Sequence, residues 1–311
     1  MKIVFFGSPD SALPSLERIL EAGHKIALII TQPDKPSGRG RKLTPSPVKK
    51  FALAHNIACY QPLKIRKDPE AVQIIKKINP DLNIVVAYGQ LIPASIIYIP
   101  QYDSLNVHFS LLPKYRGASP VQWALLKGEK KTGITIFKLD EKMDEGDILS
   151  QKEVDIYPQE RAGELEARLA QIGPELLLET ISKIDQIKPI PQDHSQATYA
   201  PRLRKEDGRI NWSINALLIE RQVRAFHPWP SAFTFLQDKR IKIIKGKKLN
   251  HEPVSNFSPG EIFSINKEGI GLVCGQKTAF LLEEIQPENK KPMRAYAFSL
   301  GCKLKLGDFF S

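Results

Sequence analysis

Cysteine is scarce in this sequence. The three that occur, Cys59, Cys274 and Cys302, lie far apart and show no CxxC spacing. Isolated cysteines indicate neither a disulfide framework nor a structural zinc site, and they are typical of proteins in a reducing compartment. We therefore expect a cytoplasmic protein that holds no metal ion.

Long apolar runs are missing as well. No run of about eighteen apolar residues occurs, so we expect no membrane-spanning helix. The apolar run at the N-terminus stops at Gly7 and Pro9, which makes it too short for the core of a secretory signal; we interpret residues 2–6 as a first strand. The turn after them, FGSPDS, lacks the GxGxxG pattern, which argues against a dinucleotide at that turn.

Acidic residues do not balance the basic ones. Lys and Arg number 45 and Asp and Glu 34, which gives a formal net charge of +11. Residues 202–311 hold 19 basic and 11 acidic side chains and carry +8, whereas residues 1–200 hold 26 and 23 and carry +3. This distribution fits an enzyme body with a polyanion-binding C-terminal part. A solubilising surface would give the same charge, so charge alone leaves both interpretations open.

Strand and helix patterns alternate through the first 150 residues. Strands are expected at residues 2–6, 25–31, 57–61, 82–88, 104–108 and 132–139, and helices at 11–22 and 71–78. This alternation predicts an α/β fold with a mostly parallel sheet covered by helices on both faces. Ligands of such sheets bind at the carboxyl ends of the strands.

The second half of the chain has a different pattern. A long amphipathic helix is expected over residues 160–185, and the polar, proline-interrupted stretch 187–201 indicates a linker. A helix at 213–225 is followed by several short strand-like runs separated by turn residues, which predict a small β-barrel. The expected domains are a catalytic domain at 1–186, a linker at 187–205 and a barrel domain at 206–311.

Three polar residues stand where the ends of neighbouring strands are expected. Asn106 and His108 are two apart, so their side chains point to the same side, and Asp144 follows one strand later. A carboxamide can donate to an oxyanion, an imidazole can exchange a proton near neutral pH, and a carboxylate can orient the imidazole or hold a water. A histidine at a strand end is often only structural, so the bare spacing does not establish catalysis.

The full sequence around these residues is more specific. Residues 104–125 read SLNVHFSLLPKYRGASPVQWAL and residues 144–147 read DEGD. These strings resemble the folate-dependent formyltransferases, whose pattern is Asn-x-His-x-Ser-Leu-Leu-Pro, a glycine-containing loop and a later Asp-x-Gly-Asp. The resemblance implies a Rossmann-like domain that binds 10-formyl-tetrahydrofolate, with Asn106, His108 and Asp144 as catalytic residues. It also implies a folate-binding set: Val86, Ala87, Tyr88, Gly89, Leu91, Ser110, Leu111, Leu112 and Pro113.

Residues 31–49 form a basic segment rich in glycine and proline. Five basic side chains stand against the single acid Asp34, and two glycines give the segment mobility. A flexible basic loop can order itself against nucleic-acid phosphates, although an ordinary solvated loop would have the same composition. The segment resembles the loop with which the methionyl-tRNA branch of this family holds the acceptor end of the tRNA. The tRNA contacts implied are Lys35, Arg39, Arg41 and Lys42.

The C-terminal third carries the same resemblance. The stretches 199–212, 224–234 and 286–301 are similar to the C-terminal domain of that branch, a small OB-like β-barrel with a basic face toward the tRNA. The resemblance therefore implies direct transfer of the formyl group from 10-formyl-tetrahydrofolate to the amino group of methionyl-initiator tRNA. The sequence does not give the oligomeric state, and we expect a monomer. The alternatives are formylation of an aminosugar nucleotide, against which the basic loop and the second domain argue, and RNA binding without catalysis, against which the three polar residues argue.

Overall fold

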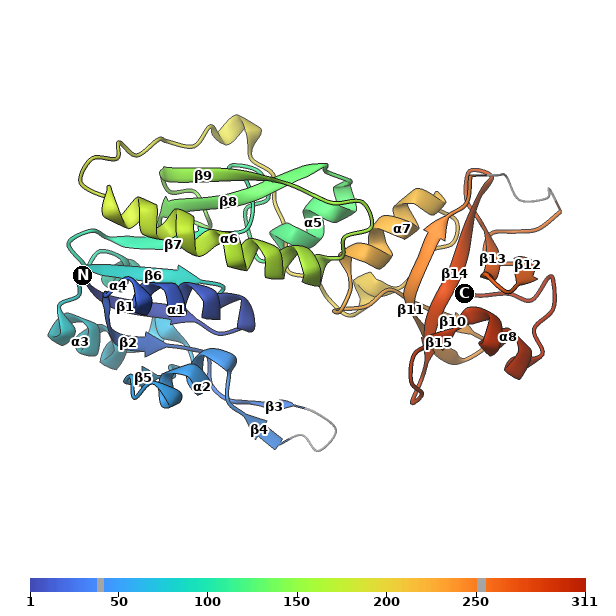
Figure 1. Ribbon diagram of the computed structural model, residues 1–311, viewed down its shortest axis with the longest axis horizontal. Coiled ribbons are helices and arrows are strands. Elements are labelled where there is room, and N and C mark those ends of the chain that lie inside the picture. Colours follow the sequence, from blue (N-terminus) through green and yellow to red (C-terminus); the bar gives the residue numbers. More distant parts are fainter. Residues whose placement is uncertain (38–41, 251–255) are drawn as a thin grey trace. The chain divides into compact units, whose positions relative to one another are not determined.

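Two compact units make up the part of the chain that the computed structural model describes, residues 1–37, 42–250 and 256–311 (Figure 1). The first unit consists of Met1–Pro120, Lys130–Ile156 and Leu165–Pro201, and the second of Val121–Glu129, Tyr157–Glu164 and Arg202–Ser311. Among the residues described, no helix is long and apolar enough to cross a membrane.

A seven-stranded sheet in the order β5-β2-β1-β6-β7-β8-β9 forms the centre of the first unit. Its strands are β1 (Lys2–Gly7), β2 (Lys25–Ile30), β5 (Cys59–Tyr60), β6 (Leu82–Val86), β7 (Ser104–His108), β8 (Lys131–Lys138) and β9 (Ile148–Asp155). The pairs from β5 to β7 are parallel, and the pairs β7–β8 and β8–β9 are antiparallel. The carboxyl ends of the five parallel strands therefore lie at one edge of the sheet, where ligands of such sheets bind.

Helices cover both faces of this sheet. The main ones are α1 (Leu13–Glu21), α2 (Pro47–Ala54), α3 (Pro69–Ile78), α4 (Ala94–Ile97) and α6 (Ala162–Ser182). On one face, Val4 and Phe6 of β1 pack in one cluster with Ile75 of α3. On the other face, Gly173 of α6 approaches Val107 of β7 so closely that an added Cβ would lie 3.3 Å from its side chain. Strands buried on both faces explain the continuous apolar runs of the sequence.

The sequence also explains where the helices begin and end. In α3 the side chain of Asp68 accepts a hydrogen bond of 2.9 Å from the amide of Ala71, and Pro69 occupies the first turn, where a missing N–H costs nothing. The helix ends at Asn79, which adopts the left-handed conformation with φ 49°. The cap and the proline thus start the helix at Pro69, whereas the apolar periodicity predicts a helix over residues 71–78.

The predicted strands of the first 150 residues are confirmed, and the sheet is mostly parallel as expected. Strand β9 was not predicted, because four polar residues in its middle, Ser150–Glu153, interrupt the apolar pattern. The helix predicted at 11–22 starts with a 3-10 turn at Asp10–Ala12 before α1 begins. The long helix predicted at 160–185 is α6.

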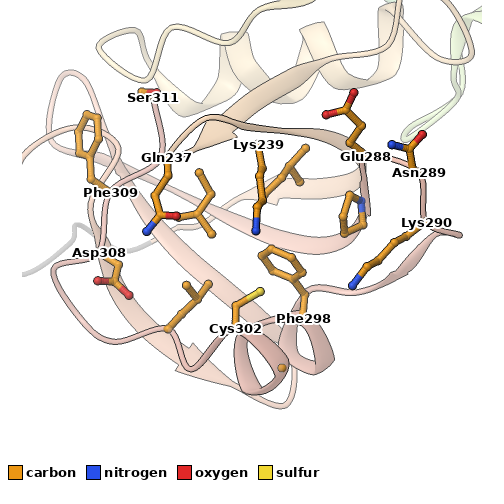
Figure 2. A pocket seen from close by; sticks show the side chains of 15 residues that line it. Gln237, Lys239, Glu288, Asn289, Lys290, Phe298, Cys302, Asp308, Phe309 and Ser311 are labelled. Atoms are coloured by element: carbon orange, nitrogen blue, oxygen red, sulfur yellow. The ribbon is translucent and has the colours of Figure 1, made fainter.

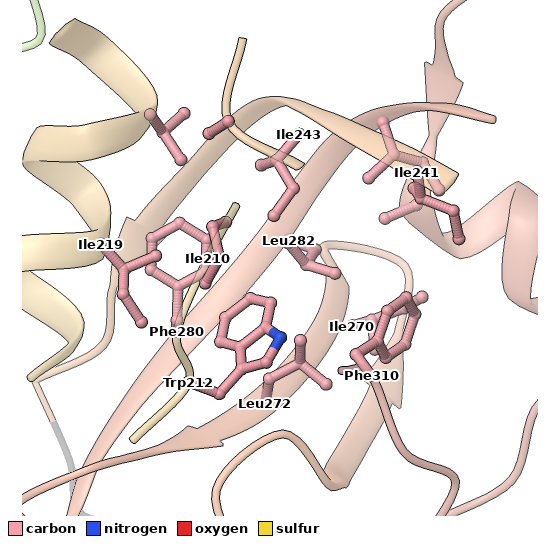
Figure 3. Packing of buried hydrophobic residues seen from close by; sticks show 14 of the residues in the cluster. Ile210, Trp212, Ile219, Ile241, Ile243, Ile270, Leu272, Phe280, Leu282 and Phe310 are labelled. Carbon is pink, nitrogen blue, oxygen red and sulfur yellow. The ribbon is translucent and has the colours of Figure 1, made fainter. Parts of the chain in front are cut away.

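An antiparallel sheet in the order β10-β11-β14-β13-β12 forms the second unit, with β15 paired to β14. Its strands are β10 (Phe233–Leu236), β11 (Lys239–Lys248), β12 (Ile262–Asn266), β13 (Gly269–Cys274), β14 (Thr278–Pro287) and β15 (Met293–Arg294), with helices α5 (Pro120–Lys127), α7 (Ala216–Ala225) and α8 (Ala295–Cys302). Figure 3 shows Trp212, Phe280 and Phe310 among the isoleucines and leucines of its core. The indole Nε1 of buried Trp212 donates to the hydroxyl of Thr234 at 3.0 Å, so its polar atom is satisfied.

The two edges of this sheet are joined by the last residues of the chain. Phe310 makes an antiparallel bridge to Leu236 at the β10 edge, and Phe309 makes one to Glu261 just before β12. Because both edge strands find a backbone partner in the same segment, the sheet is closed into the small barrel that the short strands predict.

Residues 187–201, which the sequence indicates as a linker, are bound to the first unit. Ile190 pairs with Ile148 next to β9, and Tyr199 makes a parallel bridge to Arg116. A short 3-10 turn, His194–Gln196, lies between these two contacts. Polar residues and prolines indicate a lack of regular structure, but they do not show whether the backbone is hydrogen-bonded to a distant loop. The first unit therefore extends to Pro201, beyond the boundary expected at 186.

Candidate active site

Strand β7 places Asn106 and His108 on one face of the sheet near its carboxyl edge. In the neighbouring antiparallel strand β8 their partners are Phe137 and Thr135. The period of two along a strand accounts for the shared face. The carboxamide of Asn106 is partly exposed and makes no hydrogen bond with the described residues of the chain, so it can donate to a bound ligand.

The imidazole of His108 is buried, with 6% of its surface exposed. Its Nε2 lies 2.9 Å from the backbone carbonyl of Tyr115, and its ring meets the ring of Phe137 edge-on at 6.3 Å. A carbonyl oxygen only accepts hydrogen bonds, so Nε2 carries a proton in every protonation state of this ring. Any proton that His108 exchanges with a substrate therefore passes through Nδ1.

Asp144 faces that free nitrogen. Its Oδ2 lies 3.8 Å from Nδ1 of His108 and accepts a hydrogen bond of 2.7 Å from the backbone amide of Gly117. The backbone of Asp144 is left-handed, with φ 54°, a conformation that aspartate tolerates better than most residues. The structure thus brings Asp144 to His108, although 36 positions separate them, and Asn106 lies on the same face of β7 as His108.

Two buried residues behind this group were not singled out by the sequence. Gln192 joins the loop of Asp144 to the guanidinium of Arg116, which is 1% exposed. Arg116 was noted only as part of the glycine-containing loop, and Gln192 lies in the predicted linker. No local pattern marks Gln192, because its partners are 76 and 48 positions away along the chain.

The segment Ser110–Pro113, expected to lie against the folate, has a backbone fixed by hydrogen bonds from β8 and β9. The hydroxyl of Thr135 donates to the carbonyl of Ser110 at 2.6 Å and accepts from the amide of Leu112 at 3.1 Å, and Gln151 donates to the carbonyl of Leu112 at 2.8 Å. The bond between Leu112 and Pro113 is cis. The side chains of Ser110 and Leu112 are buried, whereas Leu111 and Pro113 are partly exposed and are the ones a ligand can reach.

The second segment of the expected folate site, Val86–Leu91, begins at the end of β6. Val86 pairs with Val107, so this segment leaves the sheet beside Asn106 and His108. Its backbone turns sharply, with positive φ at Ala87 and Gly89.

The aromatic residue of this turn, Tyr88, is 1% exposed, and its hydroxyl makes no hydrogen bond with the described part of the chain. Burial raises the pKa of this phenol far above its usual value. The backbone carbonyl of Tyr88 accepts a hydrogen bond of 2.7 Å from Gln32, whose side chain occupies the space where a Cβ on Gly89 would stand.

The basic segment 31–49 contains a short hairpin, β3 (Lys35–Ser37) paired with β4 (Lys42–Thr44). Lys35 and Lys42 are exposed on it, whereas Arg39 and Arg41 lie outside the described residues. The base of the hairpin is held by Asp34, which accepts 2.8 Å hydrogen bonds from Lys49 and from Gln61. These two donors lower the pKa of Asp34. The segment is therefore not a wholly irregular loop, because its described flanks pair as strands.

A cavity of about 890 Å³ lies in the barrel unit (Figure 2). Lys239 and Lys290 line it together with Glu288 and Asp308, so that its charges are mixed, and none of the predicted site residues belongs to its lining. Within the residues that the structure describes, no group of three or more His, Cys, Asp or Glu side chains is arranged to hold a metal ion.

The first unit is thus an α/β domain that carries a carboxamide, an imidazole and a carboxylate near the carboxyl edge of its mostly parallel sheet, a set of groups suited to proton transfer and oxyanion stabilisation. Comparison with known proteins is more specific. The family model "Formyl transferase" matches residues 1–181, and "Formyl transferase, C-terminal domain" matches residues 202–303. The chain belongs to the formyl transferase family.

Curated relatives match the chain from end to end. The methionyl-tRNA formyltransferase of Alkaliphilus oremlandii is 44% identical over 310 residues, 99% of each chain. That of Thermodesulfovibrio yellowstonii is 45% identical over 313 residues, again 99% of each chain. The similarity therefore includes both units.

Solved structures share the fold at lower identity. The methionyl-tRNA formyltransferase from Clostridium thermocellum has a TM-score of 0.58 at 20% identity and covers 81% of this chain and 95% of its own. HypX from Aquifex aeolicus in complex with tetrahydrofolic acid has a TM-score of 0.65 at 18% identity, over 100% of this chain and 50% of its own.

Proposed function

We propose that this protein transfers the formyl group of 10-formyl-tetrahydrofolate to the amino group of methionyl-initiator tRNA, as a cytoplasmic monomer. The observation that carries the proposal is the similarity of 41–45% over nearly the whole length to curated methionyl-tRNA formyltransferases. The convergence of Asn106, His108 and Asp144 supports it, because this set meets the needs of acyl transfer to an amine.

In the proposed reaction the neutral methionyl amine attacks the formyl carbon. A bond forms between the amine nitrogen and that carbon, the bond from the carbon to N10 of the folate breaks, and a proton moves from the amine to N10. The Asn106 carboxamide donates to the oxyanion of the tetrahedral intermediate. His108 acts through Nδ1, as an oxyanion donor when doubly protonated and as a proton acceptor when neutral, because Nε2 is bonded to Tyr115.

Asp144 completes this arrangement. Its carboxylate, fixed by the amide of Gly117, stabilises a positive charge on His108 and can hold a water that relays the proton. The two groups contact different nitrogens of the His108 ring: the Tyr115 carbonyl lies against Nε2, and the Asp144 carboxylate faces Nδ1.

The two substrates are assigned to different parts of the chain. We assign the folate to residues 1–186, against Ser110–Pro113 and Val86–Leu91, both of which adjoin the end of β7. We assign the tRNA acceptor end to the basic hairpin, through Lys35 and Lys42 and through the sequence-predicted Arg39 and Arg41. The barrel at 206–311 contributes the remaining tRNA surface, which accords with its excess of basic residues.

The test is an acceptor competition. The protein is incubated with 10-formyl-tetrahydrofolate and either methionyl-initiator tRNA, free methionine or an aminosugar nucleotide, and the formylated product is measured. Formylation of the charged tRNA alone is expected. Transfer to the sugar, or release of formate without a formylated acceptor, would contradict the tRNA assignment while leaving the folate site intact. An Asn106→Ala and a His108→Ala variant serve as controls, and full turnover by either would contradict the catalytic assignment.

A further inference from the structure

Gln192 is a buried glutamine in the segment 187–201, with 5% of its surface exposed. Its side-chain Nε2 donates to two backbone carbonyls, that of Asp144 at 2.9 Å and that of Gly146 at 2.7 Å. Both protons of the amide are thus used on the loop that carries the proposed catalytic carboxylate, on either side of Glu145.

The other end of the same amide holds a second loop. Oε1 of Gln192 accepts from Nε of Arg116 at 3.1 Å and from its second guanidinium nitrogen at 2.7 Å. The remaining guanidinium nitrogen lies 3.5 Å from the carboxylate of Glu145. Two carbonyls on one side and a guanidinium on the other leave a single orientation of the amide that satisfies all its atoms. Gln192 therefore joins the loop of Asp144 to the loop of Arg116 and Gly117.

These two loops must keep a fixed position relative to each other for the Asp144 carboxylate to remain close to His108. The carboxylate is placed by the amide of Gly117, and Gly117 itself lies against the segment of Gln192, because an added Cβ would stand 2.8 Å from the carbonyl of Ala200. The left-handed backbone of Asp144 is a conformation that surrounding contacts have to maintain.

The same segment also holds the backbone beside His108. The hydroxyl of Thr198 accepts from the amide of Tyr115 at 2.9 Å, and the carbonyl of Tyr115 is the partner of His108. The backbone carbonyl of Thr198 also accepts a hydrogen bond of 2.9 Å from the backbone amide of Arg116. Contacts from one segment thus reach the partners of both His108 and Asp144.

We infer that Gln192 is a positioning residue for the reaction: it acts through Asp144, whose carboxylate it keeps aligned with Nδ1 of His108. The inference rests on the proposed function only in that the reaction is a formyl transfer that uses Asp144. It assigns to residues 187–201, which the sequence indicates as a linker, a part in the active site.

The test begins with Gln192→Glu. Glutamate keeps the acceptor for Arg116 but has no N–H for the carbonyls of Asp144 and Gly146, so the Asp144 loop is released while the Arg116 side is retained. The kcat is expected to fall about 30-fold, since two buried hydrogen bonds are replaced by repulsion between oxygens. The KM values for folate and tRNA are expected to stay within about threefold, because no substrate-binding residue is altered. Gln196→Glu is the matched control, since Gln196 lies in the same segment but is exposed.

A double-mutant cycle with Asp144→Asn separates positioning from general destabilisation. If Gln192 acts through Asp144, Gln192→Glu costs less than about threefold in kcat once Asp144 is neutral. An equal cost in both backgrounds, or a wild-type kcat in the single variant, overturns the inference. Single-turnover rates with enzyme in excess make the slow variants measurable. Gln192→Met, similar in size and uncharged, replaces the glutamate variant in the cycle if circular dichroism shows that the latter does not fold.

The outcomes for the inference and for the proposed function remain distinct. Wild-type formylation of methionyl-tRNA tests the function, whereas the ratios between variants test Gln192. If the wild type formylates a different acceptor, the cycle is measured with that acceptor.

Discussion

The carboxylate of Asp144 lends itself to a quantitative prediction. Asp144→Asn removes its charge but retains a side-chain oxygen that can accept the hydrogen bond from Gly117. The loop should therefore keep its shape, and the change isolates the electrostatic part of the residue's role.

The magnitude follows from the 3.8 Å between Oδ2 of Asp144 and Nδ1 of His108. Opposite unit charges at this distance attract by about 4 kcal/mol when the effective dielectric constant is about 20. That value suits this pair, because its side chains are only 6% and 13% exposed. If the imidazolium forms on the way to the transition state, losing this attraction lowers kcat by about 10³-fold.

The assay is the initial rate of formyl-methionine formation with both substrates saturating, together with thermal unfolding of each variant. Glu141→Gln is the matched control, since Glu141 is an exposed acid in the same loop, and it should turn over at the wild-type rate. An Asp144→Asn enzyme within threefold of the wild-type kcat would refute the reasoning. An unfolding midpoint lowered by more than about 5 °C would show instead that the loop did not keep its shape.

Three further predictions address other parts of the molecule. Gly117→Ala should reduce kcat at least tenfold, because Gly117 has φ +118° and an added Cβ would stand 2.8 Å from the carbonyl of Ala200; a crystal structure of the variant should show the loop displaced. Lys42→Ala should raise the KM for tRNA but not for folate and should reduce the slope of log affinity against log salt by about 1. Burial raises the pKa of the Cys274 thiol to about 12, so iodoacetamide at pH 8.5 should leave it unmodified in the folded protein while exposed Cys302 reacts. The folded state keeps the Cys274 proton above pH 9, where the unfolded chain loses it, so this thiol should lower stability as pH rises from about 9 to 12.

Local patterns were sufficient for most of the fold. The buried run of β6 and the cap and proline at the start of α3 are contained in short stretches of sequence, and both elements were predicted. Strand β9 was not predicted. Its polar middle forms a strand because it pairs with β8, and its own residues show no strand pattern. Antiparallel pairing of β7 with β8 is likewise a property of the assembled sheet.

The candidate site shows the same division. The common face of Asn106 and His108 follows from the period of a strand, and the position of Asp144 one strand later placed it at the same edge. The resemblance supplied their common role, because spacing alone gives no distance between distant loops. Gln192 could not be predicted. Its role depends on its contacts with two distant loops, those of Asp144 and Arg116. A polar, proline-interrupted sequence looks the same whether or not the folded chain makes such contacts.

The closure of the barrel by its last residues has a consequence for synthesis on the ribosome. Phe235 exchanges two backbone hydrogen bonds of 2.8 Å with Ser311, and the amide of Ile262 donates to the carbonyl of Asp308 at 2.9 Å. Until residues 308–311 have left the exit tunnel, the edges at β10 and β12 both lack their partner, and unpaired edges are where nascent chains associate. The first unit can complete its sheet while translation continues, but the second cannot close before residues 308–311 have left the tunnel. A chain that stops at residue 307 would therefore have an intact proposed catalytic centre attached to an open, aggregation-prone sheet.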